Sequence, residues 1–273
     1  MLNAQQERVF ILHASIGLLE ARRIVSNILS KPLEVQDKGT QMRDLVTQAD
    51  DRVERDLQKS FLAKFPDFAF FGEETHKKGE RINPDIPTIV VDPLDGTTNF
   101  VAGIPMVAVS VGLWYQRQAR AAAILSLADG AVYTAMRSEE GVQVTSGGAL
   151  FARPCKIIPR VGLSQALIGF DWPHKDDRRQ SIRPAIDTFL NEGRNVRVLG
   201  SAVLALLAVA QGALDAYVNA ELFPWDVAAA ALIIEEAGGM VTDFEGNPWT
   251  PDSPRLVASY PGMHEEILRA LKR

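Results

Sequence analysis

The sequence TIVVDPLDGTTNF occupies residues 88–100 and joins a short apolar run to an acidic turn. The apolar run is typical of a buried strand, and Asp92 stands at its end. We expect the turn to return Asp95 to nearly the same place, because Pro93 restricts the backbone path and Gly96 permits a conformation that other residues resist. The stretch therefore predicts two carboxylates close together at the end of a strand.

Two carboxylates at such short range repel each other strongly unless cations lie between them. Oxygen ligands without Cys or His favour Mg²⁺, which binds carboxylates, carbonyls, water and phosphate oxygens. The same turn is expected to expose the backbone N–H groups of Gly96 and Thr97 ahead of a possible helix, where a phosphate binds well. The stretch thus indicates a metal-bridged phosphate site.

Further acidic positions accompany this turn. Glu73 and Glu74 follow the apolar run 68–71, Asp50 lies near the start of a predicted helix, and Asp226 begins another. Each acid taken alone is explained by a turn or a helix cap, where such residues are common. Taken together with the acidic turn, they favour a functional cluster of carboxylates.

The composition excludes several classes of protein. The chain has 273 residues, 47% of them apolar, and a formal charge of −5, which is ordinary for a soluble globular protein. The negative charge argues against a broad surface for nucleic acid or for an anionic membrane. The single cysteine, Cys155, excludes an internal disulfide and a multi-cysteine zinc site, and we expect it to be packed rather than nucleophilic.

The sequence contains no clear targeting or membrane signal. Near the N-terminus, Glu7, Arg8 and Glu20 stand where a signal peptide would have an apolar block. The longest apolar run, residues 202–210, is about half of the roughly 18–20 residues that a membrane span needs. We therefore expect a cytoplasmic protein with no membrane partner.

Hydrophobic periodicity in the first half predicts a helix over residues 4–29, a loop over 36–46, and a second helix from about Thr47 to Phe65. Short apolar or alternating runs, separated by Gly, Pro and Asp turns, then predict a largely antiparallel sheet with the two helices across one face. The predicted strands are residues 68–71, 88–91, 107–114, 120–125 and 131–134.

The second half alternates between helices and strands. The predicted strands are residues 167–170, 196–198, 214–218 and 256–259, and the predicted helices are 178–191, 201–211, 225–237 and 263–271. A hinge at Gly147, Gly148 and Pro154 would divide the chain into halves 1–150 and 151–273. We expect a layered α/β fold with helices on both sides of sheets, most of the metal ligands in the first half, and the substrate pocket with Asp226 in the second.

Residues 92–100, DPLDGTTNF, resemble the signature of the magnesium-dependent, lithium-sensitive inositol monophosphatase family. Four further motifs follow the order expected from that family: Leu45-Val46-Thr47 leading to Asp50, Gly72-Glu73-Glu74, Gly200-Ser201-Ala202, and Trp225-Asp226 leading to Glu236-Ala237-Gly238-Gly239. The resemblance extends roughly from Lys38 to Val241. It implies an αβαβα sandwich like that of inositol monophosphatase and fructose-1,6-bisphosphatase, with a mixed, mostly antiparallel N-terminal sheet.

The resemblance also implies a binding site for two to three Mg²⁺ ions. The implied ligands are Glu73, Glu74, Asp92, the backbone carbonyl of Leu94, Asp95 and Asp226. Glu73, Asp92 and the Leu94 carbonyl would hold the first ion. Asp92, Asp95 and Asp226 would hold the second, and the glutamate pair would help to place a third.

The catalytic residues that the resemblance implies are Glu73, Thr97 and Asp50, with Thr97 positioning the attacking water and Asp50 accepting a hydrogen bond from the Thr97 hydroxyl. The implied substrate-binding residues are Asp95, Gly96, Thr97, Gly200, Ser201, Ala202, Asn219 and Asp226. The reaction would be hydrolysis of a small phosphate monoester, with inositol monophosphate as the expected substrate, by metal-activated water and without a phosphoenzyme. The resemblance further implies a homodimer.

Several positions depart from the inositol-specific pattern. Asn219 stands where family members often have a glutamate that contacts inositol, and Glu221 is two residues away. Ala102 replaces the usual histidine after the signature, and Lys38 lies about one residue farther from Asp50 than is usual. These departures touch none of the metal acids, but they favour a broader substrate specificity.

Three related activities therefore stay open: fructose-1,6-bisphosphatase, histidinol phosphatase and 3′-phosphoadenosine-5′-phosphate phosphatase. The ending Thr97-Thr98-Asn99-Phe100 favours the inositol branch, because the nucleotide branch tends to have Lys-Glu after the first Thr. A more distant alternative is a regulatory binding protein in which catalysis is secondary.

Overall fold

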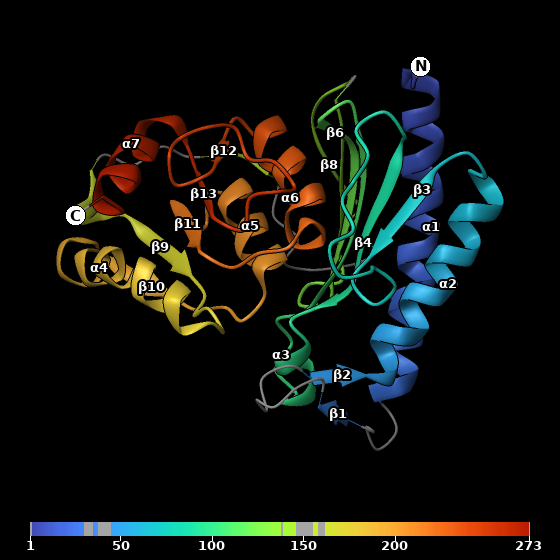
Figure 1. Ribbon diagram of the computed structural model, residues 1–273, viewed down its shortest axis with the longest axis horizontal. Helices are drawn as coiled ribbons and strands as arrows, with labels where there is room; N and C mark the ends of the chain where they lie inside the picture. Colours follow the sequence, from blue (N-terminus) through green and yellow to red (C-terminus); the bar gives the residue numbers. More distant parts are fainter. Residues whose placement is uncertain are drawn as a thin grey trace.

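The computed structural model describes residues 2–29, 35–37, 45–137, 139–145, 155–157 and 162–272. Helices and sheets alternate in five layers (Figure 1). Helices α1 (Ala4–Leu29) and α2 (Gln48–Lys64) cover the outer face of one sheet. Helices α5 (Ala202–Ala210) and α6 (Pro224–Glu236) lie between the two sheets. The outer face of the second sheet is covered by α4 (Asp176–Glu192) and α7 (Pro261–Ala270).

The first sheet has six strands in sequence order, and only its first pair, β3 with β4, is parallel. Its strands are β3 (Ala69–Gly72), β4 (Thr88–Asp95), β5 (Ala108–Tyr115), β6 (Gln118–Ser126), β7 (Val132–Met136) and β8 (Glu139–Thr145). Along β4 the buried side chains alternate between the two faces. Ile89 and Val91 belong to the apolar cluster under α1 and α2, whereas Val90 belongs to the cluster around α5 and α6.

The second sheet has five strands in the order β10-β9-β11-β13-β12, of which β10, β9 and β11 are mutually parallel. Its strands are β9 (Leu167–Phe170), β10 (Asn195–Arg197), β11 (Ala216–Asn219), β12 (Met240–Thr242) and β13 (Leu256–Ser259). The parallel strands have their carboxyl ends at one edge, where open α/β sheets usually bind ligands.

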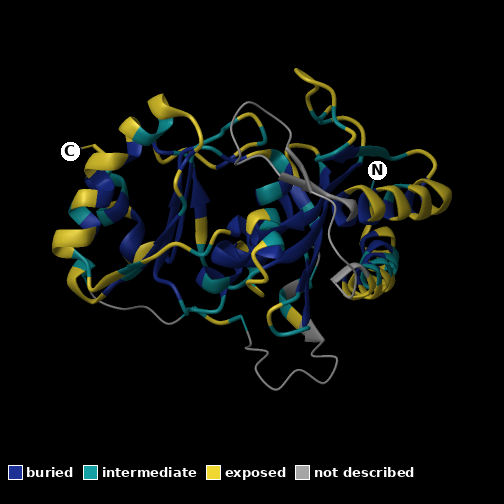
Figure 2. Ribbon diagram, turned by 90° about the horizontal axis from the view of Figure 1, so that it is seen from below, coloured by how far each residue is buried: buried dark blue, intermediate teal, exposed yellow. Residues whose placement is uncertain are grey.

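Helix α6 packs against both sheets, which explains its nearly continuous apolar sequence. It approaches the first sheet so closely that a Cβ on Gly112 of β5 would lie 3.1 Å from the Ala229 nitrogen. Figure 2 shows that the strands are mostly buried, while exposed residues lie mainly on the outer helices at the two ends of the molecule. The N-terminus of α6 is thereby held against the end of the first sheet, where the acidic turn lies.

The structure confirms the layered αβαβα class, the mostly antiparallel first sheet, and all the long helices predicted from periodicity. The predicted loop over 36–46 was wrong at its ends, because β1 (Val35–Asp37) and β2 (Leu45–Thr47) pair as antiparallel strands. Strands β8 and β12 were not predicted. The predicted hinge and the division at residue 150 lie outside the described residues, as does Lys38.

Cys155 is half-buried and packs against the central apolar cluster. Burial raises the pKa of its thiol to about 12, so the expectation of a packed, non-nucleophilic cysteine is confirmed. Among the helices that the structure describes, none combines the length and the apolar character needed to span a bilayer.

Candidate metal centre

Asp92 and Asp95 lie in the last part of β4, where the pairing with β5 shifts in register between them. Gly96 follows with φ of +90°, in the left-handed region, and the short helix α3 (Thr97–Val101) begins directly after it. A Cβ at Gly96 would lie 2.7 Å from the Met106 carbonyl oxygen, so a glycine is required on grounds of both conformation and space. The predicted turn is confirmed.

Asp226 comes from the opposite side of the site, in the first turn of α6. Its carboxylate accepts a hydrogen bond from the Phe223 amide at 2.7 Å, which fixes the side chain at the helix start. The neighbouring Trp225 is buried and stacks on Phe223 with ring centroids 4.9 Å apart, and its ring centroid is 4.5 Å from that of His76. These aromatic contacts hold the helix N-terminus in place.

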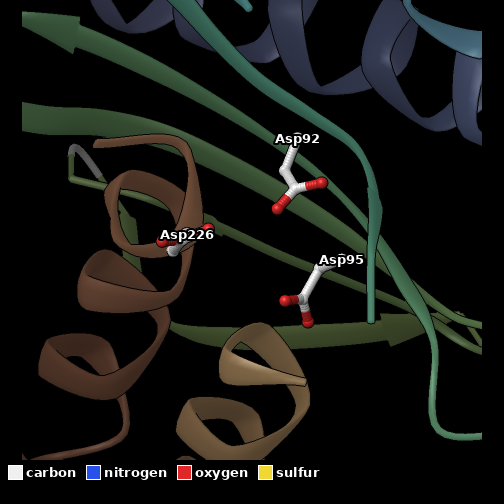
Figure 3. Close-up of side chains that lie close together, drawn as sticks. All are labelled: Asp92, Asp95 and Asp226. Carbon is white, nitrogen blue, oxygen red and sulfur yellow. The ribbon is translucent and has the colours of Figure 1, made fainter. Parts of the chain in front are cut away.

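The side chains of Asp92, Asp95 and Asp226 project into the space between β4 and α6 (Figure 3). One carboxylate oxygen from each of the three lies within 4.8 Å of the others. The two aspartates of β4 are buried, with 2% and 8% of their surface exposed. The structure therefore brings together three acids of which the first and the last, Asp92 and Asp226, are 134 residues apart in the sequence.

The N-terminus of α5 binds the Asp95 carboxylate. The Ser201 hydroxyl and the amides of Ala202, at 3.1 Å, and Val203, at 3.0 Å, all donate hydrogen bonds to it. Ser201 is also the N-cap of α5, since its hydroxyl oxygen accepts from the Leu204 amide at 3.2 Å. Negative charge at a helix N-terminus is favourable, so Asp95 is both oriented and stabilised by these groups.

Burial and mutual repulsion raise the pKa values of the clustered acids. Burial raises the pKa of Asp92 well above its ordinary value, and the charges of Glu73, Asp95, Asp226 and Asp50 raise it further. Burial raises the pKa of Asp226 to about 8, helped by the charge of Asp95. The pKa of Asp95 is raised to about 6 by burial, while its bonds from α5 hold it down. Five predicted site acids thus share one electrostatic environment.

These acids fit a divalent cation. Every ligand that they offer is a carboxylate oxygen, and within the described part of the chain no Lys or Arg forms an ion pair with the three aspartates. Buried carboxylates that repel one another and lack a cationic side chain are stabilised by a hard cation such as Mg²⁺.

The Thr97 hydroxyl differs from its predicted arrangement. It donates to the Leu94 carbonyl at 3.1 Å rather than to Asp50. The reason is local, because the left-handed conformation of Gly96 folds Thr97 back over Leu94. Asp50 is buried in the first turn of α2 and close enough to influence the charge state of Asp92. Gly96 is the N-cap of α3 and Thr97 is its first residue, and N–H groups at the start of a helix have no intrahelical partner.

The charge of Glu74 acts on Glu54, a buried acid that the sequence analysis missed. The Glu54 carboxylate accepts the Glu74 amide at 2.9 Å, and a Cβ on Gly72 would overlap that carboxylate. Glu54 follows Asp50 by four residues on α2, and this helical spacing was the signal that could have found it.

Asn99 was also missed, although it lies within the signature. Its side-chain amide nitrogen donates to the carbonyls of Met106, Leu199 and Gly200 at 2.9, 2.8 and 3.1 Å. Gly200 has a φ of +67° and a Cβ there would lie 2.9 Å from the Asn99 side-chain oxygen. Asn99 therefore fixes Gly200-Ser201-Ala202 beside the acidic turn.

Asn219 is the buried last residue of β11, and Glu221 does not take its place. The Glu221 carboxylate accepts the amides of His174 and Lys175 at 2.6 and 3.1 Å and pairs with the Lys175 ammonium at 3.2 Å. Burial alone would raise the Glu221 pKa, but the bonds from Lys175 and His174 lower it overall. Glu221 thus ties two loops together. A second missed acid, Asp171, directly follows β9 and lies near Asn219.

Known proteins resemble this chain in both sequence and structure. The Inositol monophosphatase family matches over residues 6–273. Inositol monophosphatase 3 of Solanum lycopersicum is 34% identical over 257 residues, which cover 92% of each chain. The structure of the extragenic suppressor protein suhB of Bartonella henselae matches with a TM-score of 0.85 and 29% identity, over 97% of this chain and 99% of that chain.

Two structures of SaIMPase-II are also similar, each 26% identical over 96% of this chain. One is bound to inositol monophosphate, with a TM-score of 0.77 and 92% of its chain covered. The other is bound to 2′AMP, with a TM-score of 0.79 and 93% of its chain covered.

Proposed function

The chain belongs to the inositol monophosphatase family and is a phosphoric monoester hydrolase, and we propose that it hydrolyses small polyol phosphates, inositol monophosphate first, with two to three Mg²⁺ ions. The observation that carries this proposal is the meeting of Asp92, Asp95 and Asp226 oxygens within 4.8 Å. Phosphate monoesters hydrolyse extremely slowly unaided, so charge neutralisation and a positioned water are what a catalyst must add.

The residues that would hold the ions are Glu73, Glu74, Asp92, the Leu94 carbonyl, Asp95 and Asp226. Bound Mg²⁺ supplies an activated water and neutralises the developing charge on the phosphate and the leaving oxygen. The amides of Gly96 and Thr97 bind the phosphate oxygens at the start of α3. The Thr97 hydroxyl, held by the Leu94 carbonyl, positions the attacking water.

Glu73 and Asp50 complete the catalytic set. The charges of Glu73 and Asp50 act on Asp92, which supports a role for both carboxylates near the proposed phosphate site. Both would accept hydrogen bonds from the attacking water, one of them would take its proton, and that proton would pass on to the leaving oxygen. No serine or cysteine nucleophile is required, so the reaction proceeds without a phosphoenzyme.

The leaving group faces Gly200, Ser201, Ala202 and Asn219 at the carboxyl edge of the second sheet. Asn219 offers a neutral amide there, which can both donate a hydrogen bond to and accept one from a substrate hydroxyl. The binding of both inositol monophosphate and 2′AMP by SaIMPase-II supports a panel that includes a nucleotide.

The test is Mg²⁺-dependent phosphate release from a panel of esters: inositol 1-phosphate, 2′-AMP, fructose 1,6-bisphosphate, histidinol phosphate and 3′-phosphoadenosine 5′-phosphate. We expect the highest kcat/KM with inositol 1-phosphate. The matched variants are Asp95→Asn, which should abolish turnover, and Asp187→Asn on the exposed surface of α4, which should not change it. Turnover that survives in Asp95→Asn would contradict the proposal.

We also propose that the protein is a cytoplasmic homodimer. Each chain would consist of the halves 1–150 and 151–273. The exposed apolar side chains of Ile104 and Val198, with 47% and 57% of their surface exposed, support an interface. They flank Met106 and Leu199, whose carbonyls Asn99 joins, so they belong to neighbouring segments. Light scattering after size exclusion should give twice the 29.9 kDa chain mass, and Ile104→Asp should reduce it to one chain.

A further inference from the structure

Strands β9 and β11 are parallel neighbours, so their carboxyl ends lie side by side. Asp171 directly follows β9, and Asn219 ends β11. Asp171 and Glu221 are two carboxylates at this edge of the sheet. Asp171 lies outside the motifs that identified the family. Asp171 is half-buried, and its hydrogen bonds lead to Tyr217 and to Gly200, which both adjoin the proposed leaving-group site.

A chain of two hydrogen bonds ends on Asp171, and a third bond reaches it separately. The Asn219 side-chain nitrogen donates to the Tyr217 hydroxyl oxygen at 2.8 Å, and the Tyr217 hydroxyl donates to Asp171 Oδ2 at 2.7 Å. The Gly200 amide donates to Asp171 Oδ1 at 2.9 Å. An ionised carboxylate only accepts hydrogen bonds, so the charge on Asp171 sets the direction of the whole chain.

This direction fixes the orientation of the Asn219 amide. Its oxygen accepts the Glu221 amide at 2.9 Å, while its nitrogen faces Tyr217. If Tyr217 donated to Asn219 instead, the side-chain amide would rotate and the Glu221 amide would lose its acceptor. The remaining N–H and the remaining lone pair of Asn219 are therefore presented in one arrangement only.

The second contact of Asp171 leads to the acidic turn. Gly200, held by Asp171, precedes Ser201, which binds Asp95. The Asp171 charge also raises the pKa values of Asp95 and Asp226, which shows that it lies within electrostatic reach of both.

We propose that Asp171 is a positioning residue, which acts through Tyr217 and Gly200 to fix the hydrogen-bonding groups that the pocket presents to a hydroxyl-rich leaving group. This inference rests on the proposed function, since it assigns the same pocket to the leaving group. It predicts that discrimination for the polyol part of the ligand depends on a residue that does not touch the phosphate.

Two variants separate this role from mere packing. Tyr217→Phe removes the hydroxyl and so disconnects Asn219 from Asp171. Asp171→Asn keeps an acceptor for the Gly200 amide, but its new amide group would donate to Tyr217 and reverse the chain. The double variant Asp171→Asn/Tyr217→Phe should show little loss in discrimination beyond that of Tyr217→Phe, because both changes break the same connection.

The readout is binding rather than turnover, measured by calorimetry with Ca²⁺ in place of Mg²⁺. Inositol 1-phosphate and inorganic phosphate are compared, since only the first contains the polyol. We expect both single variants to weaken the binding of inositol 1-phosphate roughly tenfold, as for loss of a hydrogen bond to a charged group. The binding of inorganic phosphate should weaken by less than about twofold. Asp187→Asn is the matched control, and thermal unfolding verifies that each variant is folded.

The outcomes separate this inference from the proposed function. If the wild type binds as expected and the variants lose discrimination, Asp171 has the assigned role even if no ester is hydrolysed, and in that case the proposed function alone fails. Three outcomes would overturn the role of Asp171. The variants could bind both ligands more weakly by the same factor, their affinities could be unchanged, or the wild type could fail to bind inositol 1-phosphate.

Discussion

The main-chain amide of Val203 donates a hydrogen bond to the Asp95 carboxylate at 3.0 Å. The N-terminus of α5 thereby binds the last residue of β4, although the two are more than 100 residues apart in the sequence. The position of Asp95, and with it the geometry of the metal centre, depends on the packing of α5 between the two sheets.

Ser201→Ala removes two bonds at this junction, one to Asp95 and one to the Leu204 amide. We expect the free energy of unfolding to fall by about 1–3 kcal/mol, since a helix cap and a bond to a charged group are both lost. The pKa of Asp95 should rise above about 6, because the Ser201 bond lowers it. Carbon-13 NMR of the metal-free protein measures this pKa, and Ser181→Ala on the exposed side of α4 is the control. An unchanged pKa would contradict the assignment.

Without metal, the clustered acids should make the protein less stable as the pH rises. Asp95 and Asp226 have pKa values of about 6 and about 8, against an ordinary value of 3.8. Between about pH 4 and pH 8 the folded state therefore binds more protons than the unfolded state, so the free energy of unfolding falls with increasing pH. Thermal unfolding in EDTA across this range measures the effect.

Asp226→Asn should flatten this dependence, because it removes the group whose pKa is shifted further than that of Asp95. Adding Mg²⁺ to the wild type at pH 7.5 should raise Tm, since the cation neutralises the carboxylates that repel one another. A wild-type Tm that is constant or increases between pH 6 and pH 8 in EDTA would contradict the electrostatic account.

His264 should act in the opposite direction and in a lower range. It is buried, with both ring nitrogens 2.8 Å from hydroxyls of Thr242 and Ser259, and burial lowers its pKa below 6.5. The unfolded state therefore binds the proton first, and stability is lost as the pH falls below about 6.5. The difference in Tm between wild type and His264→Gln, followed from pH 7 to pH 5, isolates this effect. A difference that does not change with pH would show that His264 does not titrate on unfolding.

Gly96→Ala should damage the site more than a positive φ alone explains. Gly96 and Gly79 have φ of +90° and +86°, but a Cβ would meet the Met106 carbonyl only at Gly96. Each substitution introduces strain of about 1–2 kcal/mol, and Gly96→Ala should lose further stability and nearly all activity because the turn must shift. Chemical denaturation and phosphate release measure both variants. Equal effects would refute the crowding argument.

The acidic turn could be predicted from the sequence because its determinants are local. Asp92 ends an apolar strand, and Gly96 permits the turn that returns Asp95, so short-range chemistry fixes their proximity. The outer helices were predicted for a similar reason, since one face of each packs against a sheet. Strand β12 was missed because three residues are too few to show a period, and β8 because its sequence contains little apolar alternation.

Asn99 could not be predicted as a supporting residue because its partners are main-chain groups, two of them distant in the sequence. Asn99 binds the carbonyls of Leu199 and Gly200, about 100 residues away, and no side-chain pattern encodes these contacts. The Thr97 hydroxyl was assigned to Asp50, whereas the turn directs it to Leu94. In both cases the missing information is backbone geometry, which the residue types alone do not provide.

The central claim is that the cluster of Asp92, Asp95 and Asp226 binds Mg²⁺ for phosphate-ester hydrolysis. The most direct test is the rate of phosphate release from inositol 1-phosphate, measured while Mg²⁺ is titrated into metal-free protein. We predict no turnover in EDTA, a rate that rises with Mg²⁺ to saturation, and no such rise in Asp95→Asn. A rate in EDTA equal to that with saturating Mg²⁺ would contradict the account.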